Sequence, residues 1–217
     1  MSEAVEGVAG VARINNQKHH ELVILAASAG GIVALRTILA ALPADFPLPV
    51  AVLQHRSSTM PSILPVLLSR VSALAVKEAE AGERFRPGIV YVAPATAHLI
   101  VGQDRCFHLQ DGMKINFLRS AADPLIRSAA HSLGGNVIAV ILTGGGRNGT
   151  SAVRDVGALG GTVIAQDPAT ALHAAMPRAA IATGAVDYVL PLEEIGPMLV
   201  QLASGEPGGE RSDTKAV

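Results

Sequence analysis

The sequence predicts an α/β fold, in which a doubly wound and mostly parallel β-sheet is flanked by helices and carries a small antiparallel hairpin insert. Two patterns favour this class. Short apolar runs without alternation are typical of strands that are buried on both faces of a parallel sheet. Segments with the apolar spacing of amphipathic helices lie between these runs. Because the two kinds of segment alternate, right-handed β-α-β crossovers are expected to place helices on both faces of one sheet.

The elements follow from these patterns in chain order. The predicted core strands are Leu22–Ala27, Val50–Leu53, Val137–Leu142 and Thr162–Ala165. The predicted helices are Ile32–Leu42, Pro61–Val71, Ala121–Leu133, Ser151–Leu159 and Glu193–Leu202. Residues 74–110 differ, because short apolar runs there are separated by turns, which is typical of antiparallel strands. The runs that predict the hairpin insert are Ile89–Val92, His98–Val101 and Cys106–Leu109.

A chain of 217 residues suits a single domain with a full hydrophobic core. Residues 1–20 are mixed and aperiodic, and residues 204–217 are rich in charge and in helix breakers, so both are predicted to be disordered tails. The folded domain is therefore expected to span residues 21–203.

Composition excludes several classes of function. The formal net charge is −1, which gives no electrostatic footprint for nucleic acid. A single cysteine, Cys106, excludes an intramolecular disulfide and fits a reducing compartment, so we expect a cytoplasmic protein. No secretory signal begins the chain, and the longest uncharged stretch, Ser128–Gly146, is broken by glycines, so no membrane insertion is expected.

Three loops follow predicted strands, at the edge where open parallel sheets collect their chemistry. The first loop carries Ser28, followed by Ala29, Gly30 and Gly31. Its small residues allow a tight turn that presents the hydroxyl at a helix N-terminus, where backbone amides stabilise an oxyanion. Ser28 is thus a candidate nucleophile. A serine that only caps the following helix is the structural alternative.

The second loop carries His55, which leaves a neighbouring buried strand. A histidine in that place can reach the end of the first strand, so His55 is the candidate general base for Ser28. A partly exposed surface histidine is the alternative.

The third loop, residues 143–150, contains three consecutive glycines. Such a loop lets backbone amides approach either an oxyanion or a phosphate. Gly144 and Gly149 have the spacing of a nucleotide-binding P-loop, but the lysine that should follow Gly149 is missing, which disfavours a nucleotide site. A glycine-rich turn without a ligand remains an alternative.

Taken together, the loops resemble the catalytic domain of the bacterial chemotaxis protein-glutamate methylesterases, the CheB family. The matching motifs of the three loops are Ala27–Gly31, Gln54-His55 and Ile141–Gly149. Further matches are Val76–Ala79, Pro87–Pro94, Ile164–Asp167 and Met176–Ile181. The resemblance covers about residues 22–202, so it identifies residues 21–203 as a methylesterase-like catalytic domain.

The resemblance implies a serine hydrolase that cleaves glutamyl methyl esters on chemoreceptors to glutamate and methanol, with receptor glutamine deamidation as a second activity. It implies Ser28 as nucleophile, His55 as its base, and the backbone at Ala29 and Gly145 as oxyanion donors. It implies no metal and no organic cofactor. The expected partners are the methylated cytoplasmic helices of chemoreceptors. Substrate-binding candidates are Gly30, Gly31, Arg119, Arg147 and Arg178.

Asn148 departs from the family pattern, because it stands where the family has the aspartate that completes the triad. An aspartate stabilises the imidazolium that forms during attack, whereas an amide supplies no charge. Asp155 and Asp167 are the nearby acids, and neither is a convincing substitute. We therefore expect a Ser-His-Asn site with reduced activity. A catalytically silent protein that binds receptors as a scaffold is the alternative.

The second departure lies upstream, where family members usually carry a receiver domain. Only about 20 residues precede the resemblance here. We expect a catalytic domain without a receiver domain, which is constitutive, regulated by a separate protein, or part of a longer chain.

Overall fold

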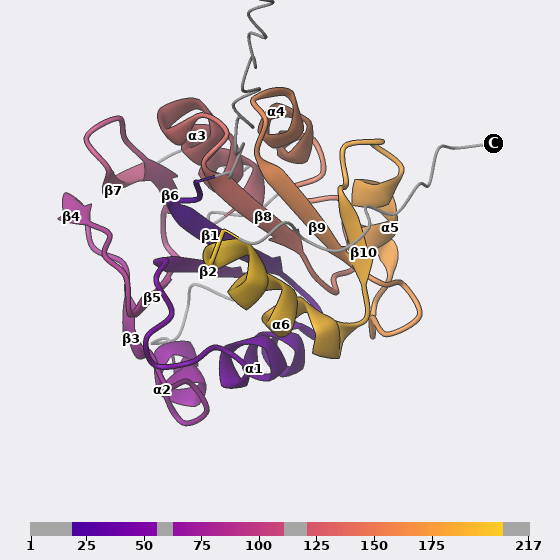
Figure 1. The fold of residues 1–217 in the computed structure, drawn as a ribbon, viewed down its shortest axis with the longest axis horizontal. Helices are drawn as coiled ribbons and strands as arrows, with labels where there is room; N and C mark the ends of the chain where they lie inside the picture. The colour runs from indigo at the N-terminus through magenta and orange to yellow at the C-terminus, as the bar shows by residue number, and fades with distance from the viewer. Residues whose placement is uncertain (1–18, 56–62, 111–120, 206–217) are drawn as a thin grey trace, which may run out of the picture.

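The computed structural model describes residues 19–55, 63–110 and 121–205, which form a three-layer α/β sandwich (Figure 1). Its centre is a seven-stranded sheet with the strand order β10-β9-β8-β1-β2-β5-β3, in which every neighbouring pair is parallel. The strands are β1 (Leu22–Ala27), β2 (Val50–Gln54), β3 (Ala75–Glu78), β5 (Ile89–Val92), β8 (Val137–Ile141), β9 (Thr162–Gln166) and β10 (Tyr188–Leu190).

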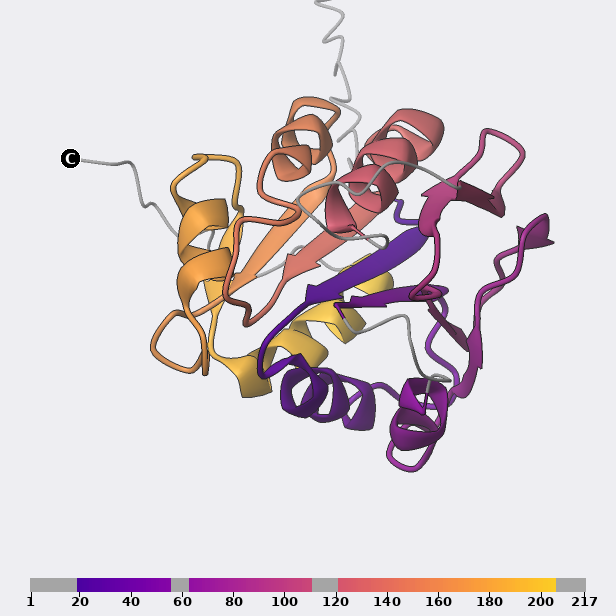
Figure 2. The ribbon, with the colours of Figure 1, turned by 180° about the vertical axis from the view of Figure 1, so that it is seen from behind.

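Helices cover both faces of this sheet, as opposite views show (Figures 1 and 2). One face carries α1 (Gly31–Ala40), α2 (Leu64–Ser69) and α6 (Leu192–Ala203). The other carries α3 (Ala122–Leu133), α4 (Ala152–Ala158) and α5 (Ala175–Ile181). The predicted doubly wound class is therefore confirmed.

The central strand β1 shows why the strands have apolar residues at every position. All six of its residues are fully buried. Successive side chains alternate between the two hydrophobic clusters, so that Ile24 packs toward the α3 and α4 layer and Leu25 toward the α1 and α6 layer. A strand that is covered on both faces cannot tolerate a polar alternate position.

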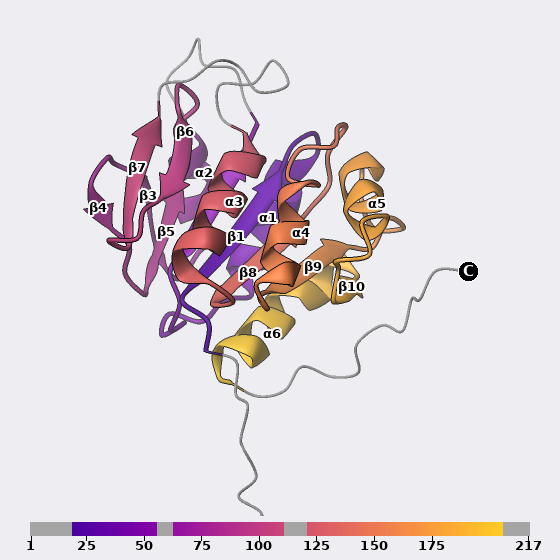
Figure 3. The ribbon, with the colours of Figure 1, turned by 90° about the horizontal axis from the view of Figure 1, so that it is seen from above.

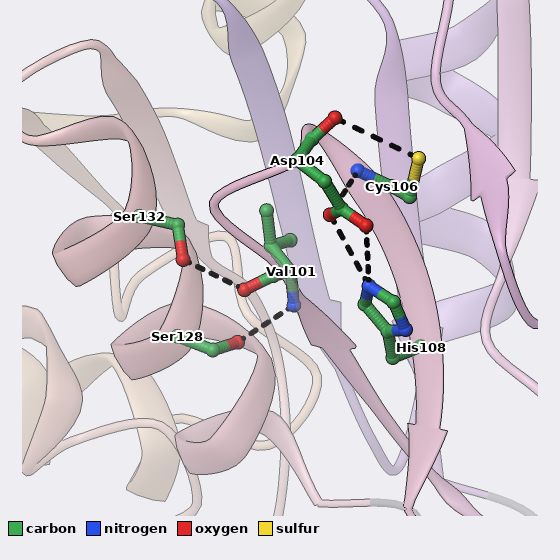
Figure 4. Close-up of polar contacts among 6 residues, drawn as sticks. All are labelled: Val101, Asp104, Cys106, His108, Ser128 and Ser132. Carbon is green, nitrogen blue, oxygen red and sulfur yellow. Dashed lines mark hydrogen bonds and ion pairs between the residues drawn. The ribbon is translucent and has the colours of Figure 1, made fainter.

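A second, antiparallel sheet has the order β4-β7-β6 and lies beside α3 (Figure 3). Its strands are β4 (Glu83–Arg84), β6 (His98–Val101) and β7 (Cys106–Gln110). Two serines of α3 fix this sheet through Val101: the Val101 N–H donates to Ser128 Oγ at 2.9 Å, and Ser132 Oγ donates to the Val101 carbonyl at 2.8 Å (Figure 4). At the hairpin tip, the Asp104 carboxylate contacts His108 Nε2 at 3.1 Å. The two serine bonds hold α3 against this sheet.

One part of the predicted hairpin insert is wrong. Ile89–Val92 is β5, which pairs in parallel with β2 and β3 in the main sheet, so only β6 and β7 form the hairpin. Short apolar runs between turns do not reveal whether a strand joins a parallel or an antiparallel neighbour. Helix α5 and strands β3, β4 and β10 were not predicted. The tails lie almost entirely outside the described residues, so the predicted boundaries at residues 21 and 203 stay predictions.

Among the described residues, no helix is both long and apolar enough to cross a membrane.

Candidate active site

The three central strands bring the predicted loops to one edge of the sheet. Strand β1 pairs with β2 on one side and with β8 on the other, and all three run in the same direction. Ala27 at the end of β1 lies opposite Gln54, and Ala26 lies opposite Ile141. Ser28, His55 and the loop that holds Asn148 therefore leave the sheet side by side.

Ser28 lies half-buried in the turn between β1 and α1. Its N–H donates to the Thr143 carbonyl at 3.0 Å, and its carbonyl accepts from the Gly31 N–H at 2.9 Å. Gly30 has φ 78° and is itself the N-cap of α1, which has no side-chain cap. The alternative that the Ser28 side chain caps the helix is therefore contradicted. A left-handed φ favours glycine at position 30.

Gln54 ties the first loop to the second, a role that the sequence analysis missed. Its Nε2 donates to the Ser28 carbonyl at 2.8 Å and to the His55 carbonyl at 3.0 Å. The His55 N–H also donates to the Ala27 carbonyl at 3.2 Å. A Cβ on Gly31 would overlap Gln54 Oε1. A polar residue at the end of a buried strand, next to a candidate histidine, was the available signal.

Asn148 is buried and contacts His55: its Nδ2 lies 2.5 Å from His55 Nε2. Its Oδ1 accepts from the backbone N–H groups of Ala122 at 2.9 Å and Asp123 at 3.4 Å, at the N-terminus of α3. Because backbone N–H groups only donate, the amide oxygen must face them and the amide nitrogen must face His55. The amide therefore donates to Nε2, and neutral His55 carries its proton on Nδ1.

The environment of His55 disfavours the charged imidazolium. Burial lowers the pKa of His55, and the negative charge of Asp123 partly opposes that shift by raising it. Asp155, in contrast, pairs with Arg127 at 2.8 Å on the surface, and Asp167 accepts the Ala169 N–H at 2.8 Å. Among the described residues, neither of these two acids bonds His55, so their role stays as the sequence predicts it.

Ser28 and His55 open into the same depression, which has a volume of about 280 Å³. Its remaining lining is Ala29, Gly30, Gly31, Ile32, Val33 and Gln54. Among the described residues, no hydrogen bond joins the Ser28 hydroxyl to His55. A larger depression of about 590 Å³, lined by Glu21 and Pro49, lies at the amino-terminal ends of β1 and β2, away from these loops. The chemistry expected here needs Ser28, so we assign the candidate site to the smaller one.

Known proteins share this arrangement of strands and loops. A model of the CheB methylesterase family matches residues 23–199. The chain belongs to the CheB methylesterase family.

Relatives in this family differ in length. The protein-glutamate methylesterase/protein-glutamine glutaminase 2 of Caulobacter vibrioides is 40% identical over 187 residues, which are 84% of this chain and 54% of that protein. A putative protein-glutamate methylesterase/protein-glutamine glutaminase of Leptospira interrogans is 37% identical over 184 residues, which are 85% of this chain and 95% of that protein. The chain thus spans about half of the first relative and nearly all of the second.

The fold has a solved counterpart. The crystal structure of the Thermotoga maritima CheB methylesterase catalytic domain matches with a TM-score of 0.81 and 40% identity, over 84% of this chain and 98% of that one. The resemblance inferred from the sequence is confirmed. The roles of the individual residues stay predictions.

Two backbone groups of this CheB-family chain are suited to bind an oxyanion. Within the described residues, the N–H groups of Ala29 and Gly145 donate no hydrogen bond to a protein acceptor, whereas that of Gly144 donates to the His173 carbonyl at 2.8 Å. A Cβ on Gly145 would meet nothing within 4 Å, so the backbone there is open to a ligand. Both predicted donors are therefore available for an oxyanion.

The predicted substrate-binding residues of this CheB-family domain are placed unequally. Gly30 and Gly31 line the depression beside Ser28. Arg147 and Arg178 are exposed, on the third loop and on α5. Arg119 lies outside the described residues.

Proposed function

We propose that this chain is a protein-glutamate methylesterase that hydrolyses glutamyl methyl esters on chemoreceptors to glutamate and methanol, and that it also deamidates receptor glutamines. Membership of the CheB methylesterase family supports the esterase, and the names of the Caulobacter and Leptospira relatives support both activities. A separate regulatory protein remains part of the proposal.

Ser28 and His55 would carry the reaction. The Ser28 hydroxyl attacks the ester carbonyl, and His55 accepts its proton on Nδ1, the ring nitrogen that Asn148 does not contact. This step requires the His55 tautomer that carries its proton on Nε2. The tetrahedral intermediate expels methanol, which takes up that proton, and leaves a glutamyl ester on Ser28. Water, deprotonated by His55, then attacks this ester, and His55 returns the proton to Ser28 Oγ as the bond to the receptor glutamate breaks. The Ala29 and Gly145 N–H groups would stabilise the oxyanion in both steps.

The observation that carries the proposal is the placement of Ser28 at the N-terminus of α1, in one depression with His55. The positive end of the helix dipole favours developing negative charge there. The unused N–H of Ala29 lies next to the nucleophile in the chain. These features suit acyl transfer better than a phosphate site, whose expected lysine is missing after Gly149.

Methanol release from a methylated receptor cytoplasmic fragment tests the proposal. The wild type is expected to release methanol faster than Ser28→Ala, and Ser69→Ala is a matched control because its hydroxyl bonds only the Val66 carbonyl on exposed α2. Wild-type release no faster than that of Ser28→Ala would contradict the proposal. Ammonia release from the unmodified fragment tests deamidation in the same way.

A catalytically silent receptor-binding protein is the second candidate, and the orientation of Asn148 favours it. Because the Asn148 amide donates to Nε2, the remaining ring nitrogen, Nδ1, carries a proton and cannot accept one from Ser28. Receptor binding without detectable methanol release would support this candidate. Rapid labelling of Ser28 by a fluorophosphonate would contradict it.

A further inference from the structure

Asp123 is a buried acid that the proposed reaction does not use. It is the second residue of α3, and only 8% of its surface is exposed. Its carboxylate accepts three hydrogen bonds from the segment after Asn148: from Gly149 N at 2.8 Å, from Ser151 Oγ at 2.6 Å and from Ala152 N at 3.2 Å. A carboxylate with three donors and little solvent is held in one place.

These bonds complete an exchange between two helix ends. The α3 N-terminus has no side-chain cap of its own, and its amides at Ala122 and Asp123 donate to Asn148 Oδ1. The α4 N-terminus also lacks a cap of its own, and its first amide, at Ala152, donates to the Asp123 carboxylate. Asn148, which precedes α4, therefore caps α3, and Asp123 in α3 caps α4. This exchange fixes the loop between residues 148 and 152.

Within the part of the chain that the structure describes, no cation pairs with the Asp123 carboxylate. Its carboxylate oxygens bond two amides and one hydroxyl. Arg127 pairs with Asp155 instead, and it joins this network only through Ser151 Oγ, at 3.1 Å. Asp123 raises the pKa of His55 by its negative charge, against the stronger effect of burial.

We propose that Asp123 is a positioning residue of this site: its carboxylate fixes the loop that holds Asn148 against His55. Because Asn148 bonds both Asp123 and His55, Asp123 also places near the imidazole the negative charge that Asn148 lacks. The effect of Asp123 on the reaction rests on the proposed function, whereas its effects on the loop and on the protonation of His55 do not. A histidine that gains a proton during attack is stabilised by such a charge even without direct contact.

The charge is tested by titrating the protein labelled with ¹³C in its histidine rings, with the His55 resonance assigned from its loss in His55→Gln. In Asp123→Asn, His55 is expected to titrate at a lower pH than in the wild type. Asp155→Asn is the matched control, because it removes a partly exposed acid paired with Arg127, and His55 should titrate there as in the wild type. A folded Asp123→Asn whose His55 titrates at the wild-type pH or higher overturns the role of the charge.

The position is tested with Asp123→Glu, which keeps the charge and displaces the carboxylate. Fluorophosphonate labelling of Ser28 should fall by about 100-fold, as expected for a misplacement of about 1 Å. Wild-type labelling in a folded Asp123→Glu overturns the positioning role, and this variant also decides the question if Asp123→Asn does not fold. The histidine titration needs no turnover, so a wild type without methanol release would refute the proposed function and leave the test of Asp123 intact.

Discussion

Replacing Asn148 by aspartate is predicted to raise the turnover of the candidate site. The two side chains have the same shape, so one oxygen can keep accepting from the amides of Ala122 and Asp123. The other oxygen takes the place of Nδ2 and can only accept a hydrogen bond, which the N–H of His55 Nε2 then donates. The His55 proton then moves to Nε2, and Nδ1 becomes the basic nitrogen that is left for Ser28.

The magnitude follows from what the change restores. In a Ser-His-Asp triad, the opposite change from aspartate to asparagine lowers turnover by about 10⁴-fold, or about 5.5 kcal/mol of barrier. The gain here should be smaller, because the new charge would be buried and would lie near the carboxylate of Asp123. The α3 N-terminus offsets part of this penalty, by about 0.3–1 kcal/mol. We expect a gain of about 10²- to 10³-fold.

The assay compares methanol release by the wild type and Asn148→Asp on one methylated receptor fragment, with Ser28→Ala as the blank. Asn148→Ala distinguishes the effect of the added charge from the effect of losing the amide donor, because it removes the amide that holds the His55 tautomer and adds no charge. It should release methanol more slowly than Asn148→Asp, because it restores neither the charge nor a side chain that orients His55. A rate for Asn148→Asp within about twofold of the wild type would refute the reasoning, because it would mean that neither tautomer nor charge limits turnover.

Two further predictions concern stability. Gly31→Ala should lower the free energy of unfolding in urea by about 1–3 kcal/mol, because the new methyl group would overlap Gln54 Oε1, whereas Gly146→Ala has open space and should change it far less. Equal effects of the two changes would contradict this. Burial lowers the pKa of His55, so neutral His55 stabilises the folded state above about pH 6.5, and that stability is lost as pH falls toward the lowered pKa. The free energy of unfolding in urea should therefore change less between about pH 7.5 and pH 5.5 in His55→Gln than in the wild type. An equal change in the two proteins would refute the lowered pKa of His55 as its cause.

Local patterns were sufficient where a residue's neighbours lie close in the sequence. The run that forms β1 is apolar at every position, so it could be assigned to a doubly covered strand at its correct bounds. The run that forms β5 has the same character, but its place depends on register with β3, where Ala75 lies opposite Ile89. That pairing is set by tertiary packing, so the periodicity of apolar residues in the sequence does not predict it. Helix α5 is only seven residues long and contains Pro177, which hides its helical pattern.

The candidate site likewise contains residues that the sequence predicted and residues that only the structure revealed. The order of strand, loop and helix predicted that Ser28, His55 and Asn148 would gather at one sheet edge, because each directly follows a central strand or its loop. The contributions of Gln54 and Asp123 needed the structure. Asp123 lies 25 residues before Asn148 in the chain, and only the packing of α3 against α4 brings its carboxylate to Gly149. No motif near Asn148 indicates that acid.

The structure also changes what the substitution at position 148 means. In the sequence, asparagine in place of aspartate is a lost charge. In the fold, the α3 amides occupy the Asn148 oxygen, so the substitution also places a donor where the family pattern has an acceptor. The bonds that stabilise the α3 and α4 ends therefore select the His55 tautomer as well. An aspartate could make the same capping bonds, so efficient helix capping gives no reason for asparagine at this position, and catalysis is the property on which the two residues differ most.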